Sequence, residues 1–122
     1  MSNVFTLDSM REEIEREFAP LKINLADGSE VDLRNILRLP KTERTKAAAQ
    51  LKVVQEVQKE DTEELTRVDA LAEAMLPLLE ILAGSKGKKL VEELSDDTML
   101  TLKVFTAWMS RSQPGEAKPS QD

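Results

Sequence analysis

Apolar residues recur at helical spacing near the start of the chain. Between residues 7 and 18, every third or fourth position is apolar and the positions between them are mostly charged. The apolar positions are Leu7, Met10, Ile14 and Phe18. This period predicts an amphipathic helix that begins near residue 8, where Asp8 and Ser9 can accept hydrogen bonds from free amides. Pro20 is expected to end it.

The next stretch changes from a helical period to strict alternation. Two short runs with alternating apolar and polar residues flank Asp27 and Gly28, and glycine can adopt positive φ at little cost. We therefore expect a β-hairpin over about residues 21–34. Because two strands alone are marginally stable, their apolar face must pack on helices or on a strand of another chain. That face carries Ile23, Leu25, Val31 and Leu33.

Two long helical patterns follow. The first covers Lys41 to Gln58, and the second starts after the possible caps Asp61 and Thr62 and runs to Ala83, before Gly84. Residues 41–60 carry five basic and three acidic groups, whereas residues 61–83 carry one basic and six acidic groups. Opposite net charges favour pairing of the two helices as an antiparallel hairpin.

A last helix is predicted after the cap candidates Ser95, Asp96 and Asp97, and it includes Trp108. Residues 111–122 contain no large apolar residue and are predicted to be a disordered tail. The expected fold is thus mainly α with a small N-terminal β-hairpin, of the α+β class. Residues 1–110 would form a single domain built on a helical hairpin or bundle.

Composition excludes several classes of function. The chain has 122 residues with 17 Lys and Arg against 23 Asp and Glu, so its net charge of −6 disfavours nucleic acid as a partner. It has no Cys and no His, which removes most hydrolase and zinc mechanisms. No uninterrupted apolar run is long enough to enter a membrane. We therefore expect a cytoplasmic protein that is not an enzyme and uses no cofactor or metal.

Three clusters of charged residues could carry chemistry, but each has a simpler interpretation. The carboxylates of Glu12, Glu13, Glu15 and Glu17 are expected on a solvated helix face. The segment from Asp27 to Asp32 lacks the alternating acids of a calcium loop, so a hairpin turn is preferred. The lysines at 86, 88 and 89 lack a phosphate-loop pattern and are expected in a solvated linker.

The segment from Leu71 to Ala83 is apolar on more than one face. It is either a central helix surrounded by the others or a helix with one face left for a partner protein. The partner-binding residues predicted under the second interpretation are Leu71, Met75, Leu78 and Leu82, followed by Trp108 and Met109. Trp108 can equally be a core residue, because tryptophan is enriched both in cores and at interfaces.

Residues 3–44 resemble a known family. They contain FTLD, REE followed by REFAP, a hairpin with DG, and LRNILRLPK, in that order. This series resembles the tail assembly chaperones of long-tailed bacteriophages, which are chaperones of the tape measure protein. The resemblance implies a chaperone that binds the tape measure protein in the host cytoplasm, assists tail tube assembly and is absent from the mature virion. It also implies that a longer, frameshifted product can contact the tail tube protein. The sequence leaves open whether the chain forms a homo-oligomer.

One alternative function is compatible with the residues, and a second is not. A virion structural protein, such as a head-to-tail connector, would use the hairpin for strand addition. A small regulatory protein with a helix-turn-helix would need a basic recognition helix, which the sequence lacks.

Overall fold

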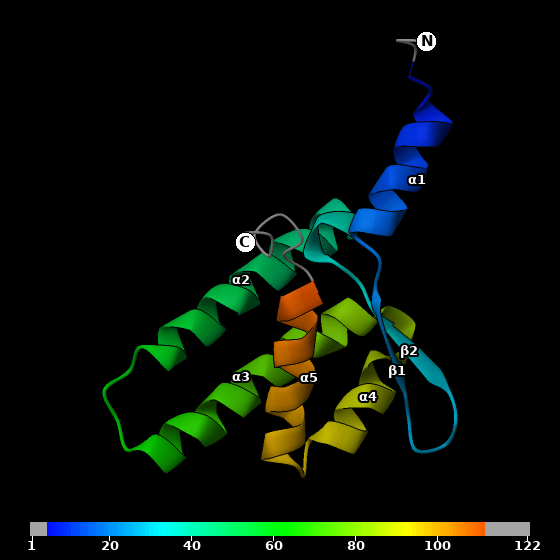
Figure 1. Cartoon of the computed structure of the whole chain (residues 1–122). Helices are drawn as coiled ribbons and strands as arrows, with labels where there is room; N and C mark the ends of the chain where they lie inside the picture. Colours follow the sequence, from blue (N-terminus) through cyan, green and yellow to red (C-terminus); the bar gives the residue numbers. More distant parts are fainter. Residues whose placement is uncertain (1–4, 112–122) are drawn as a thin grey trace, which may run out of the picture.

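The computed structural model describes residues 5–111. In this range the chain forms five α-helices, two 3-10 helices and one β-hairpin (Figure 1). In chain order they are α1 (Leu7–Glu17), β1 (Leu21–Asn24), β2 (Glu30–Leu33), η1 (Ile36–Arg38), α2 (Lys41–Gln58), α3 (Glu64–Ala83), η2 (Gly84–Lys86), α4 (Gly87–Leu94) and α5 (Thr98–Arg111). The predicted fold class is therefore confirmed. Arg111 still belongs to α5, and the rest of the predicted tail lies outside the described residues.

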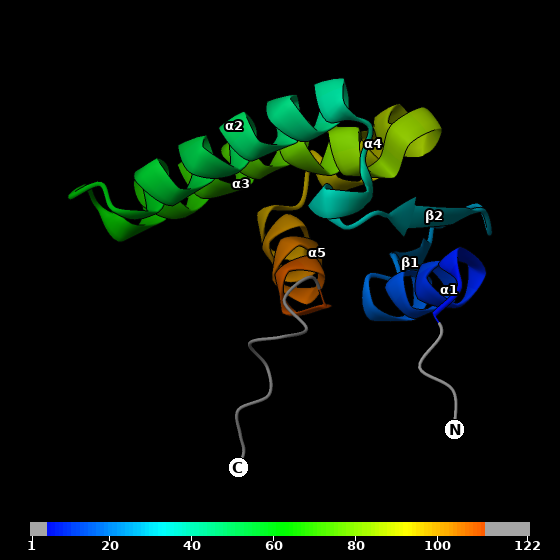
Figure 2. The ribbon, with the colours of Figure 1, turned by 90° about the horizontal axis from the view of Figure 1, so that it is seen from above.

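The helices α2 and α3 lie side by side as the predicted helical hairpin (Figures 1 and 2). The bounds of α2 are those expected from the sequence, but α3 begins at Glu64 rather than directly after Asp61 or Thr62. Arg67 in the first turn of α3 donates to the carbonyls of Glu60 and Thr62 at 3.4 and 3.2 Å. The N-cap of α3 is Glu63 and no side chain caps this helix, so the predicted caps Asp61 and Thr62 are wrong.

The N-terminal caps of the first and last helices differ in how well the sequence predicted them. In α1 the cap is Thr6, whose hydroxyl accepts from the amide of Ser9 at 3.0 Å, so the prediction of Asp8 or Ser9 is wrong. Before α5, the carboxylate of Asp97 accepts from the amide of Leu100 at 3.0 Å, as one of the predicted cap candidates should.

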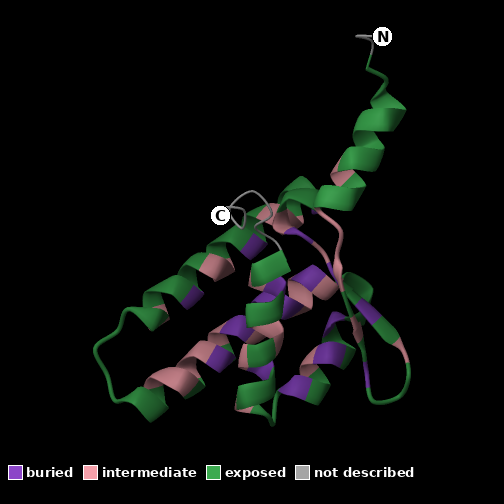
Figure 3. Ribbon diagram, in the orientation of Figure 1, coloured by how far each residue is buried: buried purple, intermediate pink, exposed green. Residues whose placement is uncertain are grey.

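The hairpin packs its apolar face on the helices. Its two strands are antiparallel, with Ile23 opposite Val31 and Leu21 opposite Leu33. Val31 and Leu33 are completely buried and belong to the hydrophobic core, together with residues of α2, α3, α4 and α5. The purple segments in Figure 3 show this core between the hairpin and the helices. The predicted docking of the hairpin is confirmed, and its partners are helices of the same chain.

The helix α4 lies close against the end of α3, and Gly87 makes this approach possible. A Cβ atom at position 87 would overlap the carbonyl oxygen of Glu80 and lie 2.8 Å from its Cγ. The backbone of a packed helix cannot yield as a flexible side chain can. A residue larger than glycine must therefore push the two helices apart.

We expect Gly87→Ala to lower the free energy of unfolding by about 1 to 3 kcal/mol, although alanine favours helix formation. Urea unfolding followed by circular dichroism measures the change. Lys88→Ala is the matched control, because Lys88 is exposed on the same helix and should change stability little. Equal midpoints for Gly87→Ala and the unchanged protein would show that the helices have room for a methyl group.

Candidate interaction surface

The structure places the predicted partner residues of α3 mainly in the core. Leu78 and Leu82 have no exposed surface and Met75 is 5% exposed, whereas Leu71 is half-buried. Some of Leu71, Leu78 and Leu82 were expected to remain accessible, and of these three only Leu71 keeps part of its surface exposed. The physical reason is that the hairpin, α2, α4 and α5 all pack around α3, so that its apolar faces meet the same chain. The alternative interpretation, a central helix, describes these residues.

Trp108 is also part of the core. It is 2% exposed, its ring lies 5.9 Å from that of Phe105, and its indole N–H donates to the carbonyl oxygen of Arg34 at 3.0 Å. The sequence left two roles open for Trp108, in the core or at an interface, and the structure supports the role in the core. Met109, the next residue, is half-buried and packs against the edge of the core.

Arg34 connects three elements, and the sequence offered no signal for it. Its guanidinium donates to the carbonyls of Ile81 and Leu82 at 2.9 and 3.0 Å, and it pairs with Glu43 on α2 at 3.1 Å. A cation at the C-terminus of α3 also complements the helix dipole. Because the carbonyl of Arg34 accepts from Trp108, this residue joins the hairpin to α2, α3 and α5.

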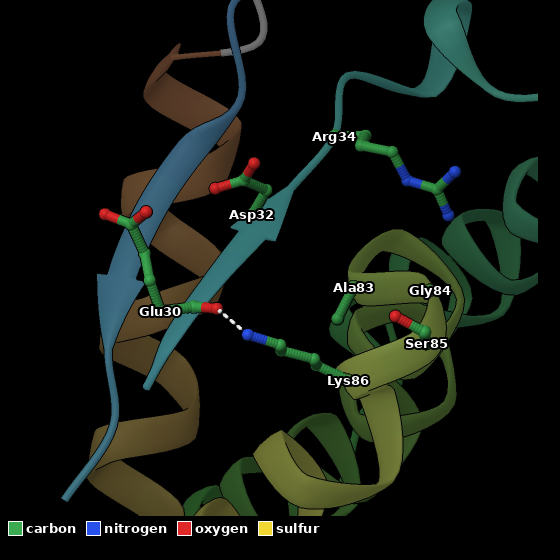
Figure 4. A pocket seen from close by; sticks show the side chains of 7 residues that line it. All are labelled: Glu30, Asp32, Arg34, Ala83, Gly84, Ser85 and Lys86. Carbon is green, nitrogen blue, oxygen red and sulfur yellow. Dashed lines mark hydrogen bonds between the residues drawn. The ribbon is translucent and has the colours of Figure 1, made fainter. Parts of the chain in front are cut away.

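The hairpin turn is attached to η2 and α4. The ammonium of Lys86 donates to the carbonyl oxygen of Glu30 at 2.8 Å (Figure 4), and the carboxylate of Glu93 accepts from the amide of Ala26 at 3.1 Å. An open cleft of about 460 Å³ adjoins the first of these contacts. Its walls are Glu30, Asp32, Arg34, Ala83, Gly84, Ser85 and Lys86. The three lysines are exposed, as predicted, but the segment forms η2 and α4 rather than a linker, and Lys86 and Lys89 hold the turn.

Asp27 at the tip of the turn is occupied by partners from the same chain. Its carboxylate pairs with Lys89 at 2.6 Å and accepts from the amide and hydroxyl of Ser29 at 2.9 and 2.6 Å. Hydrogen bonding from the Lys89 ammonium, with Ser29 adding to it, holds the pKa of Asp27 well below its usual value. Gly28 beside it has φ of +89°. The segment is thus the hairpin turn that the sequence favoured over a calcium loop.

Metal-binding clusters and membrane-spanning helices are both absent from the described residues. Within residues 5–111 there is no cluster of three or more acidic side chains that could hold a metal ion. The glutamates of α1 are exposed, as expected for a solvated face. In the same range, no helix has the length and apolar character of a membrane span. The described residues also carry exposed apolar side chains.

One such surface runs along the outer side of α5. Trp108 and Phe105 face the core, whereas the opposite side forms a shallow hollow of about 480 Å³, which we call the α5 stripe. It consists of Met99, Leu102, Lys103, Thr106, Ala107 and Ser110. These positions repeat at steps of three and one, so they follow one helix face and can receive a second helix. Met99 is 68% exposed. Sequence reasoning did not define this face as a whole, because Lys103, Thr106 and Ser110 interrupt its apolar pattern.

A second surface lies on α1, which extends away from the rest of the chain (Figure 1). No residue of this helix is buried, and Leu7 and Met10 are 68% and 40% exposed. Together with the half-buried Ile14 and Phe18 they form what we call the α1 stripe. The periodicity predicted this amphipathic helix, but not that none of its residues would be buried.

Comparison with known proteins identifies relatives over the whole chain. A family model described as mycobacteriophage tail assembly protein matches residues 1–117. Tail assembly protein Gp24 of Mycobacterium phage L5 is 32% identical over 98% of both chains, and Gp24 of Mycobacterium phage D29 is 30% identical over the same shares. Tail assembly protein Gp25 of phage L5 is 29% identical over 97% of this chain, which spans only 47% of Gp25. No solved structure matches the chain.

These matches agree with the resemblance seen in residues 3–44, and they extend it through the helical part. The family model alone covers far more than half of the chain, and two relatives match it from end to end. The chain therefore belongs to the mycobacteriophage tail assembly protein family.

Proposed function

We propose that the chain is a tail assembly chaperone that binds helical segments of the tape measure protein and assists assembly of the tail tube. The α5 stripe is the observation that carries this proposal. It is an apolar helix face with a hollow, and it lies on the side of α5 that the core does not use. Helical partners bind to such faces through apolar anchors spaced by three and four residues.

The charge of the α5 stripe narrows the kind of helix that it suits. The whole of α5 carries Lys103 and Arg111 and no acidic residue. Thr106, Ala107 and Ser110 are small enough to let a second helix come close. The preferred segment of the tape measure protein is therefore an amphipathic helix with apolar anchors and acidic flanking residues.

The match to Gp25 supports a second part of the proposal. This chain resembles two proteins of phage L5. It matches nearly the whole length of Gp24 and about half of the length of Gp25. A short and a long protein that share one region are what a frameshifted longer product would generate. The additional part of such a product would contact the tail tube protein, while the shared region holds the tape measure protein.

The proposed site of action is the host cytoplasm, before the tail is complete, and the chaperone would not remain in the mature virion. The alternative, a virion connector that acts by strand addition, has less support. Each hairpin strand has only four residues, and the turn between the strands is attached to α4. A partner strand would therefore gain few backbone hydrogen bonds.

We expect Met99→Glu combined with Ala107→Glu to weaken binding of the purified tape measure protein of the same phage by at least about tenfold, since apolar anchors dominate such contacts. A pull-down with titrated tape measure protein measures the change, and circular dichroism verifies folding. Val53→Glu is the matched control, because Val53 is 42% exposed on α2, which lies on the other side of α3 from α5 (Figure 2). Unchanged binding by the folded double variant would exclude the α5 stripe as the binding site for the tape measure protein.

A further inference from the structure

The hairpin turn contains the only Asp-Gly pair in the sequence, Asp27 and Gly28. Such a pair can rearrange without an enzyme. The backbone nitrogen of the glycine attacks the side-chain carbonyl carbon of the protonated aspartate, one molecule of water leaves, and a five-membered succinimide ring forms. Water then opens the ring at either carbonyl, which gives back aspartate or gives isoaspartate. Glycine favours the attack because it has no side chain to shield its nitrogen.

The folded chain holds both oxygens of the Asp27 carboxylate. Oδ2 pairs with the ammonium of Lys89 at 2.6 Å, and Oδ1 accepts from the amide and the hydroxyl of Ser29 at 2.9 and 2.6 Å. The hydrogen bond from Lys89 is the main reason why the pKa of Asp27 lies well below its usual value. An ionised carboxylate is a poor electrophile and has no hydroxyl group that could leave as water. The ion pair therefore opposes the first step of the rearrangement.

The attacking nitrogen is held as well. The amide of Gly28 donates to the carbonyl oxygen of Leu25 at 2.9 Å, and the φ of Gly28 is +89°. To close the ring, this nitrogen must turn toward the side chain of Asp27 and give up its hydrogen bond. Both reacting groups are thus restrained as long as the turn keeps its folded conformation.

We propose that Asp27 is a site of isoaspartate formation, and that Lys89 suppresses the reaction while the turn is attached to α4. The product would not fit the turn, because isoaspartate adds one carbon atom to the main chain. This addition would displace Leu25 from Ser29, whose carbonyl oxygen accepts from the Leu25 amide at 2.8 Å. Isoaspartate at this position would therefore mark chains whose turn has been released from α4. The inference does not depend on the proposed binding of the tape measure protein.

The experiment follows the purified full chain at neutral pH in water enriched in heavy oxygen. Each opening of the ring adds one heavy oxygen atom at Asp27, which mass spectrometry detects in the tryptic peptide of residues 23–34. We expect Lys89→Gln to raise the rate of labelling at least about tenfold, because the protonated fraction of a carboxyl group grows about tenfold for each unit of pKa. Lys89→Arg keeps the cation and should label nearly as slowly as the unchanged chain.

Lys88→Gln is the matched control, since Lys88 is exposed next to Lys89 on α4, and it should not alter the rate. Partial unfolding is separated from loss of the ion pair by adding urea to the unchanged chain until circular dichroism shows the same unfolded fraction as for Lys89→Gln. Faster labelling of Lys89→Gln at this matched fraction supports the proposal, and equal labelling would overturn it. It would also be overturned if the folded, unchanged chain were labelled as fast as a synthetic peptide of residues 23–34.

Discussion

Replacing Trp108 by alanine is expected to lower the free energy of unfolding by about 3 to 5 kcal/mol, the usual cost of removing a buried aromatic side chain. A small domain has only about 5 to 15 kcal/mol in total, so a large fraction of the molecules should then unfold at moderate temperature. The loss combines the cavity beside Phe105 with the missing donor to the Arg34 carbonyl. Urea unfolding followed by far-ultraviolet circular dichroism measures it without using the tryptophan signal.

Trp108→Phe separates the two contributions. It keeps an aromatic ring in the core but removes the indole N–H, so the Arg34 carbonyl loses this donor, at a cost of about 1 to 3 kcal/mol. Thr106→Ala, on the exposed side of the same helix, is the control and should change stability little. If Trp108→Ala folded with nearly normal stability but lost its partner, Trp108 would act as an interface anchor rather than as a core residue.

Val31→Asp is expected to abolish stable folding. Val31 has no exposed surface, so the new carboxylate would be buried without a cationic partner or would force the hairpin off α3. The expected loss of unfolding free energy is about 4 kcal/mol or more, in the range of the most damaging single substitutions. A melting curve recorded by circular dichroism is the measurement, and a thermal midpoint like that of the unchanged chain would contradict the packing of β2.

Two neighbouring substitutions calibrate this prediction. Ile23 lies opposite Val31 in the hairpin but is only half-buried, so a carboxylate at position 23 can reach water and Ile23→Asp should cost less. Asp32→Ala changes an exposed side chain on the same strand and should alter stability by no more than about 0.5 kcal/mol. The expected order of stability is thus Asp32→Ala, then Ile23→Asp, then Val31→Asp.

The sequence by itself determined the elements and most of their limits. Pro40 precedes α2, and the helical period after it fixed the range Lys41–Gln58. Gly84 ends α3 with φ of +67°, a conformation that other residues rarely adopt. Alternation around Gly28 predicted the hairpin. These features are local, because the period of the side chains and the backbone limits of proline and glycine act within a few residues.

Only the tertiary structure decided which apolar faces are covered. The pattern of α3 is the same whether its second face meets a partner or the same chain, and the packing of four other elements around it buried Leu78 and Leu82. Trp108 became a core residue because the fold brings it to the carbonyl of Arg34, 74 positions earlier in the chain. Conversely, the periodicity of α1 is that of an ordinary core helix, yet the fold buries none of its residues. Burial depends on contacts between distant segments, and the period of one segment contains no information about its neighbours.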